Sequence, residues 1–187
     1  MSVNIQLEWT PNPSTLKYVV DTKLLPSGAF NITSAQTAAE KSPLAQKLFD
    51  IKGVVGVMIG TNFVTVTKGD DGEWDELNDG VMLTLDKHLG EGGVVVKPEV
   101  LEARAKELAE KGSDIENRIK EILEAEIRPA VAMDGGDITL DKFEDGVVYL
   151  HMQGSCSGCP SSTATLKQGI ESRLKESFPE VSEVVAV

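Results

Sequence analysis

Short runs in which apolar and polar residues alternate dominate the first ninety residues of the chain. Val3, Ile5 and Leu7 alternate with polar residues, which is the period of a half-buried β-strand. Proline and glycine separate the runs at Thr10–Pro13 and Leu25–Gly28, because proline fixes φ and removes a backbone donor. Five strands are therefore predicted in this part, at Val3–Glu8, Leu16–Asp21, Ala29–Thr33, Val54–Ile59 and Phe63–Thr67.

Two helices are expected between and after these strands. Ser42 followed by Pro43 provides an N-cap and a first-turn proline, and this helix should run to about Asp50. A second helix should begin near Trp74, because apolar residues then recur every four positions. That stripe consists of Leu77, Val81, Leu85 and Leu89. Residues 1–90 are thus predicted to form one small α+β domain.

Glycines at positions 90, 92 and 93 mark the end of that domain. The pattern leaves open whether Val94–Val96 is a short strand or part of a connection. Glu99–Lys111 is charged and rich in helix-forming residues but has little apolar periodicity, which is typical of a solvated helix. Residues 91–112 are therefore interpreted as a helical linker.

The remaining residues, 113–187, predict a second α+β domain in the order helix, strand, strand, loop, helix, strand. Ser113 and Glu116 have the spacing of a capping box, and the helix that follows should end or kink at Pro129. Asp145-Gly146 is a strong hairpin signal. The strands are expected at Ile138–Phe143, Val147–Gln153 and Val181–Val187, and the second helix from Pro160 to Phe178.

Composition narrows the classes of function. The 187 residues carry 18 basic and 30 acidic side chains, a net charge of −12, and both halves are acidic. Such a surface repels a phosphate backbone and an anionic membrane, so neither nucleic acid nor a membrane is an expected partner. No apolar run is long enough to span a bilayer, and the first residues resemble no export or transit signal, so a cytoplasmic location is expected.

The two cysteines, Cys156 and Cys159, are the most informative feature of the chain. Their spacing on a loop rich in glycine can direct both sulfurs to one metal centre, and Pro160 should begin a helix directly after them. The positive end of that helix should favour the thiolate form. Since zinc and iron–sulfur sites usually take four protein ligands, two chains that each supply both cysteines are the simplest complete set. His88 and His151 show no recognised spacing to the pair and are interpreted as ordinary surface or rim residues.

Three other interpretations of the cysteine pair stay open on spacing alone. A Cys-X-X-Cys at a helix start is also the signature of thiol–disulfide oxidoreductases, although no βαβ unit and no preceding tryptophan lead into this one. The pair could also hold a structural zinc ion shared between chains, or lie in a chemically inert loop.

The cysteine loop and its surroundings resemble the Nfu family, the NifU-like iron–sulfur cluster carriers. The matching segments of the second domain are Ile127–Ala130, Asp134–Asp137, Gly154–Thr163 and Thr165–Lys167, and Thr10–Lys17 resembles the family's N-terminal domain. The resemblance implies a 4Fe-4S cluster held between two protomers, a homodimer, by Cys156 and Cys159 of each. It implies receipt of the cluster from an upstream scaffold and delivery to apo iron–sulfur proteins, with no catalytic turnover.

Roles for the other motif residues follow from their chemistry. Gly135 and Gly136 are expected to permit a tight turn, since glycine tolerates positive φ. Asp134 and Asp137 are expected to cap that turn rather than to contact iron. Thr10–Leu16 is either a surface for partner proteins or a loop made rigid by its prolines.

Overall fold

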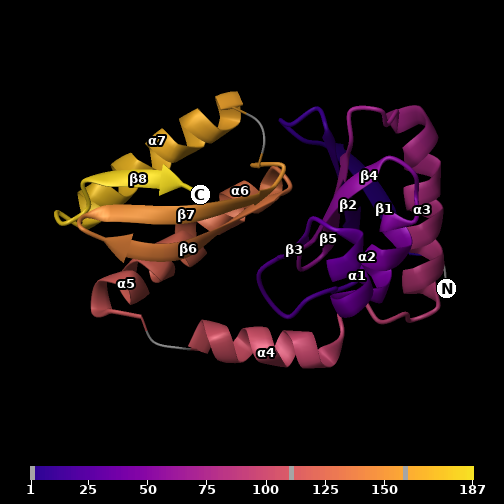
Figure 1. Cartoon of the computed structure of the whole chain (residues 1–187), viewed down its shortest axis with the longest axis horizontal. Helices are drawn as coiled ribbons and strands as arrows, with labels where there is room; N and C mark the ends of the chain where they lie inside the picture. The colour runs from indigo at the N-terminus through magenta and orange to yellow at the C-terminus, as the bar shows by residue number, and fades with distance from the viewer. Residues whose placement is uncertain (1–2, 110–111, 158–159) are drawn as a thin grey trace. The chain divides into compact units, whose positions relative to one another are not determined.

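The computed structural model describes residues 3–109, 112–157 and 160–187. The chain divides into two compact units, Met1–Glu110 and Lys111–Val187, each of which has its own buried core (Figure 1). Both units combine helices with a β-sheet, so the predicted α+β class is confirmed.

The first unit is built on a five-stranded antiparallel sheet in which β1 and β3 are the edge strands. All five strands lie within a residue or two of the ranges predicted from alternation. In spatial order they are β1 (Ile5–Trp9), β2 (Thr15–Val20), β5 (Phe63–Lys68), β4 (Val54–Ile59) and β3 (Phe30–Ile32).

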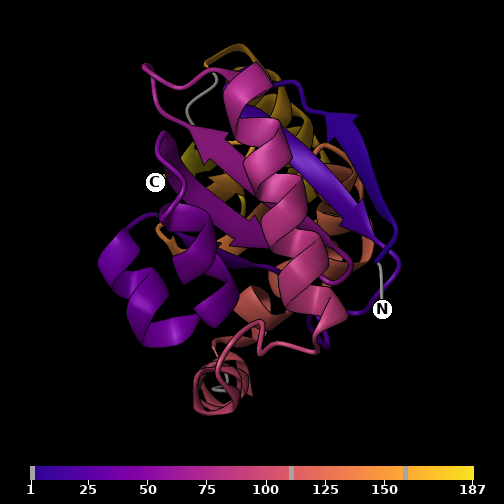
Figure 2. The same ribbon diagram turned by 90° about the vertical axis from the view of Figure 1, so that its right-hand side faces the viewer.

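Three helices accompany this sheet, and α3 (Trp74–Gly90) lies diagonally across one face of it (Figure 2). Leu77, Val81 and Leu85 of α3 are buried, as the four-residue spacing predicts. Helix α2 (Pro43–Phe49) begins at the predicted cap, where the Ser42 hydroxyl accepts from the backbone N–H of Ala45. Helix α1 (Ala35–Lys41) was not predicted, because Ala38 is its only buried residue and no apolar stripe marks it.

The segment after α3 is attached to the first core. Val94–Val96 forms no strand, yet Val96 is buried in the core and the Val95 carbonyl accepts from the Ser42 hydroxyl. Helix α4 (Pro98–Ala109) follows, and its Val100 and Leu101 pack against the same core. The first part of the expected linker 91–112 therefore belongs to the folded first unit.

The second unit contains a three-stranded sheet with β7 in the centre. Strands β6 (Gly136–Glu144) and β7 (Val147–Gly154) form an antiparallel hairpin, and β8 (Glu183–Ala186) pairs in parallel with β7. Asp145 and Gly146 both have positive φ, 51° and 82°, which is the geometry of the predicted Asp-Gly hairpin turn.

A helical segment with a local π turn leads into that hairpin. It runs through α5 (Asp114–Ile122), the π-helical η1 (Leu123–Ile127) and α6 (Arg128–Met133). Pro129 does not end the helix. The wider π turn lies directly before it, and the N–H of Arg128 donates to the Leu123 carbonyl, five residues back. Helix α7 (Pro160–Ser177) then connects β7 to β8.

The core of the second unit lies between these helices and the sheet. It includes Ile119 and Leu123 from the first helical segment and Ile170 and Leu174 from α7. Arg173 of α7 forms two hydrogen bonds with Glu126 of η1, at 2.6 and 2.8 Å, and so holds the two helical segments together.

The capping box at the start of α5 predicts how this unit responds to acid. The Glu116 carboxylate accepts from the N–H and hydroxyl of Ser113 and from the N–H of Phe143 in β6. These bonds, led by the backbone bond from Ser113, lower the pKa of Glu116 in the folded state. The contribution of Glu116 to stability is therefore complete at a pH above the pKa that this side chain has in the unfolded chain. It is lost as the pH falls through the lower pKa of Glu116 in the folded state.

We expect Glu116→Gln to destabilise the second unit by up to about 1 kcal/mol at neutral pH, because glutamine keeps the capping geometry but loses the negative charge near the helix N-terminus. The loss should begin to shrink as the pH falls below about 4, the pKa of the unfolded carboxylate, and should disappear below the lower pKa of the folded carboxylate. Urea unfolding followed by circular dichroism from pH 3 to 7 measures this. The control is Glu121→Gln, an exposed position on the same helix. A pH-independent difference between Glu116→Gln and the wild type would contradict the assignment.

Candidate metal centre

The cysteine loop connects the end of β7 to the start of α7. Cys156 lies in a turn directly after Gly154, and its side chain is buried, with 6% of its surface exposed. Cys159 lies outside the described residues. Helix α7 begins at Pro160, as the sequence predicts. The loop therefore places Cys156 between the hairpin and the start of a long helix.

Hydrogen bonds tie this loop to the turn that precedes β6. The hydroxyl of Ser155 donates to the Asp134 carbonyl, and the N–H of Ser155 donates to the Gly135 carbonyl at 3.2 Å. Gly135 and Gly154 have φ values of 75° and 63°, a region that favours glycine. The predicted tight turn at Gly135 is confirmed, and it fixes the position of the residue next to Cys156.

Gly136 is needed for a different reason from the one predicted. A Cβ atom built at Gly136 would lie 2.3 Å from the Cys156 sulfur, far inside van der Waals contact. Glycine is therefore required at this position because a side chain would not fit, and not because φ is positive. The first residue of β6 thus provides the surface against which the thiol packs.

Arg128 and Asp137 form a mostly buried ion pair beside this turn. The guanidinium donates to both carboxylate oxygens, Nε to Oδ1 at 2.8 Å and Nη2 to Oδ2 at 2.9 Å. Burial disfavours the charged guanidinium, but the hydrogen bonds and charges of Asp137 and Glu124 together outweigh it, and the pKa of Arg128 is raised. The expectation that Asp137 caps the turn is therefore wrong, because its carboxylate is used in joining α6 to β6.

The electrostatics of Cys156 also differ from the expectation. Burial is the main reason that the pKa of the thiol rises to about 11, and the carboxylates of Asp134 and Asp137 act in the same direction. The predicted preference for the thiolate is not seen at this cysteine. With this pKa, the buried Cys156 side chain is a neutral thiol at physiological pH.

Neither histidine joins the cysteine loop. His151 is exposed on β7, where its ring contacts the Val187 carbonyl and the Asp141 carboxylate. His88 is buried in the first unit, and its Nε2 lies 2.9 Å from the Val94 carbonyl. Within residues 3–109, 112–157 and 160–187, no group of three or more His, Cys, Asp or Glu side chains could hold a metal ion.

Sequence reasoning identified Cys156, its loop and Gly136, but it missed the tertiary contacts around the loop. Arg128 carried no predicted role, and nothing in its spacing to Asp137 shows that a π turn brings them together. The close contact of Gly136 with Cys156 likewise depends on strand register, since Gly136 pairs with Gly154 across β6 and β7. The two adjacent glycines were the only available signal.

Both units of the chain match known protein families, and several known proteins are similar to the whole chain. Residues 119–185 match the family described as NifU-like domain, and residues 5–92 match the family described as scaffold protein Nfu/NifU N terminal. The protein named NFU1 iron-sulfur cluster scaffold homolog, mitochondrial, from Homo sapiens is 39% identical over 184 residues, which is 98% of this chain and 71% of that protein. The protein of the same name from Drosophila grimshawi is 40% identical over 186 residues, or 98% of this chain and 61% of that protein. The solution structure of a NifU-like protein from Saccharomyces cerevisiae aligns with a TM-score of 0.47 and 27% identity, covering 52% of this chain and 87% of that one.

Two α+β units, with a Cys-X-X-Cys loop at a helix start in the second, define a NifU-like protein. The chain belongs to the Nfu family, since both of its units match the family's domains and its relatives align along nearly its whole length. It spans from 61% to 73% of the length of curated relatives such as those from Drosophila grimshawi and Schizosaccharomyces pombe.

The contact between Gly136 and Cys156 leads to a test of packing. We expect Gly136→Ala to destabilise the second unit by about 1–3 kcal/mol, because the new methyl group displaces the sulfur from a close-packed position. Gly169→Ala is the control, since a Cβ there meets nothing within 4 Å on α7. That control should be neutral or stabilising by up to about 1 kcal/mol. Urea unfolding measures both, and equal effects of the two changes would contradict the packing described.

The buried ion pair gives a second prediction for the site. Arg128→Leu should cost about 3 kcal/mol, because it leaves the Asp137 carboxylate buried without a partner. The double variant Arg128→Leu/Asp137→Leu should recover more than half of that loss. Arg173→Leu, which breaks the exposed pair with Glu126, should have a much smaller effect. Additive effects of the two changes in the double variant would show that the pair is not coupled.

Proposed function

We propose that this protein carries a 4Fe-4S cluster between two protomers and transfers it to apo iron–sulfur proteins. Cys156 and Cys159 of each protomer would supply the four thiolates, and an upstream scaffold would supply the cluster. The cluster is cargo in this scheme, and no small substrate is converted. The relatives named as iron–sulfur cluster scaffolds support this role.

The observation that carries the proposal is the position of Cys156. Its sulfur lies against Gly136 at the junction of β7 and α7, on a loop whose backbone is fixed by Ser155 and Gly154. Backbone N–H groups of such glycine-rich loops can donate to cluster sulfurs. Because the chain contains only two cysteines, a second protomer is the natural source of the other two thiolates.

Transfer would proceed by exchange of ligands at iron. Thiolates of an acceptor protein would replace Cys156 and Cys159 one after another, and the dimer would separate as its shared cargo leaves. A site completed only between two chains is simple to open, which suits a cargo that must be passed on. The same arrangement would allow loading from a donor by the reverse sequence of exchanges.

The enzyme alternative is a thiol–disulfide oxidoreductase that uses the same two cysteines. Burial raises the pKa of the Cys156 thiol to about 11, but this does not separate the two roles, because a catalytic nucleophile and a metal ligand are both thiolates. The relatives named as iron–sulfur cluster scaffolds favour the carrier. An interchain structural zinc site would use the same cysteines and differs from the proposal in the metal it retains.

The cellular location is part of the proposal. In the part of the chain that the structure describes, no helix is both long enough and apolar enough to cross a membrane. We propose a cytoplasmic location for the chain. Several of its relatives are named as mitochondrial proteins.

Anaerobic reconstitution with iron and sulfide tests the proposal. About four irons per two chains, together with a shift from monomer to dimer by analytical ultracentrifugation, is the expected result. Cys156→Ser and Cys159→Ser should each abolish both the brown colour and the cluster-dependent dimer. Ser157→Ala, which keeps both thiols in the same loop, should retain them.

Three outcomes would overturn the proposal. A stable cluster on a monomeric chain would exclude bridging between protomers. A colourless protein that forms a reversible disulfide between Cys156 and Cys159 would support the oxidoreductase. A colourless dimer that retains zinc would support the structural site.

A further inference from the structure

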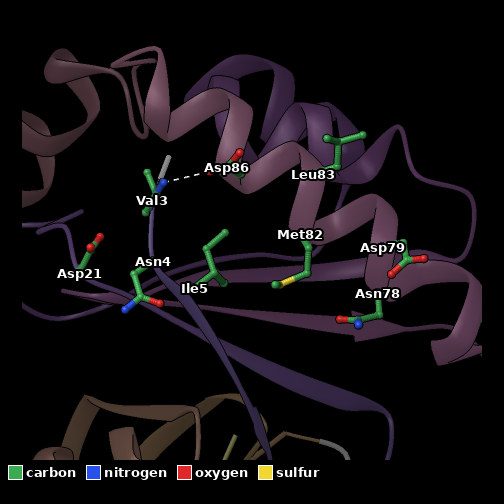
Figure 3. Close-up of a pocket in the computed structure, with 9 residues that line it drawn as sticks. All are labelled: Val3, Asn4, Ile5, Asp21, Asn78, Asp79, Met82, Leu83 and Asp86. Carbon is green, nitrogen blue, oxygen red and sulfur yellow. Dashed lines mark hydrogen bonds between the residues drawn. The ribbon is translucent and has the colours of Figure 1, made fainter. Parts of the chain in front are cut away.

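The first unit contains an open groove of about 810 Å³ between β1 and α3 (Figure 3). Its apolar lining comes from Val3 and Ile5 on one side and from Met82 and Leu83 on the other. Leu83 has 69% of its surface exposed although it lies on a helix whose other leucines are mostly buried. The groove is thus an apolar surface that the described part of the first unit leaves uncovered.

The strand that forms one wall of the groove is an edge strand. The Asn4 carbonyl accepts from the N–H of Asp21, which places Asn4 in a hydrogen-bonded pair with the end of β2. Because hydrogen-bonded and non-bonded pairs alternate in antiparallel sheets, the backbone groups of Ile5 and Leu7 point away from β2. Such a row of outward N–H and C=O groups is a template for one more strand.

The rim of the groove is acidic. Asp79 and Asp86 of α3 and Asp21 after β2 line it, and none of the described lining residues is a lysine or arginine. Asp86 accepts from the N–H of Val3 with one oxygen, at 2.9 Å. The Asn78 side-chain oxygen, also in the lining, is buried and has no hydrogen-bond partner within the part of the chain that the structure describes.

We infer that this groove binds an extended, cationic segment of a partner protein. The segment would add a strand along β1, place one apolar side chain between Ile5 and Leu83, and direct basic side chains to Asp79 and Asp86. The inference goes beyond the proposed function, because it holds whether or not the cysteines bind a cluster.

The spacing of the charges supports this choice of occupant. Asp79 and Asp86 are separated by about 10 Å along the helix axis at 1.5 Å per residue. In an extended segment, residues on one face that are four positions apart are separated by about 13 Å. Basic residues at positions n and n+4, with an apolar residue at n+2, therefore have nearly the same separation as the two carboxylates. Because α3 runs diagonally to the sheet, the flexible lysine side chains would span the remaining offset.

Binding of a defined peptide to the full chain tests the inference. The probe is the capped peptide SKTVTKS, titrated into ¹⁵N-labelled protein at low salt. The matched control peptide SETVTES replaces both lysines with glutamates. Chemical-shift changes confined to residues 3–9 and 78–86 for the lysine peptide alone are the expected result.

Variants on α3 sharpen the test. Leu83→Lys should weaken binding about tenfold, because it removes the apolar contact and repels the peptide. Asp79→Asn should weaken it about twofold to fivefold, and this difference should disappear at high salt. Glu76→Gln makes the same change in charge on an exposed position of α3 outside the groove and should have no effect.

Four results would overturn the inference. One is equal binding of the two peptides, which would remove the role of charge. The second is binding that Leu83→Lys leaves unchanged, and the third is a set of shifts centred on the second unit. The fourth is a concentration-dependent shift at the groove without peptide, which would make a second copy of this chain the occupant.

Discussion

The close contact between the Cys156 sulfur and the backbone of Gly136 is the constraint on which the second unit's site depends. It requires glycine as the first residue of β6 and the pairing of Gly136 with Gly154 across the hairpin. It also requires a turn held by the hydrogen bond from Ser155 to the Asp134 carbonyl. Each of these features comes from a different element, so the position of one sulfur is determined by the whole unit. A loop held in this way fixes Cys156 in one position.

The two units carry different candidate sites. The first has no cysteine and offers an open sheet edge beside an acidic groove, whereas the second holds the thiols. If both proposals hold, recognition of a partner and possession of the cargo reside in separately folded parts of one chain. Each part could then change in sequence without disturbing the packing of the other.

Features that depend on residues close together in the sequence were predicted correctly, whereas features that depend on tertiary contacts were not. Alternation, caps and the Asp-Gly turn act within a few residues, and they predicted the strands and the helix starts at Ser42 and Ser113 correctly. Helix α1 was missed because it buries a single alanine. The roles of Gly136 and Asp137 were misassigned because their partners, Cys156 and Arg128, are brought to them by strand register and by a π turn. Cysteine spacing located the candidate site, but its supporting contacts are tertiary and left no local pattern.

The π turn at Leu123–Ile127 amounts to one extra residue within an otherwise continuous helix. Each residue of an α-helix turns the chain by about 100°, so that single extra residue sets the rotation of everything that follows it. Without it, the Arg128 side chain would emerge on a different side of the helix from the Asp137 carboxylate. The number of residues in this segment therefore affects the direction of the Arg128 side chain, in addition to the contacts that the segment's own side chains make with Arg128 and Arg173.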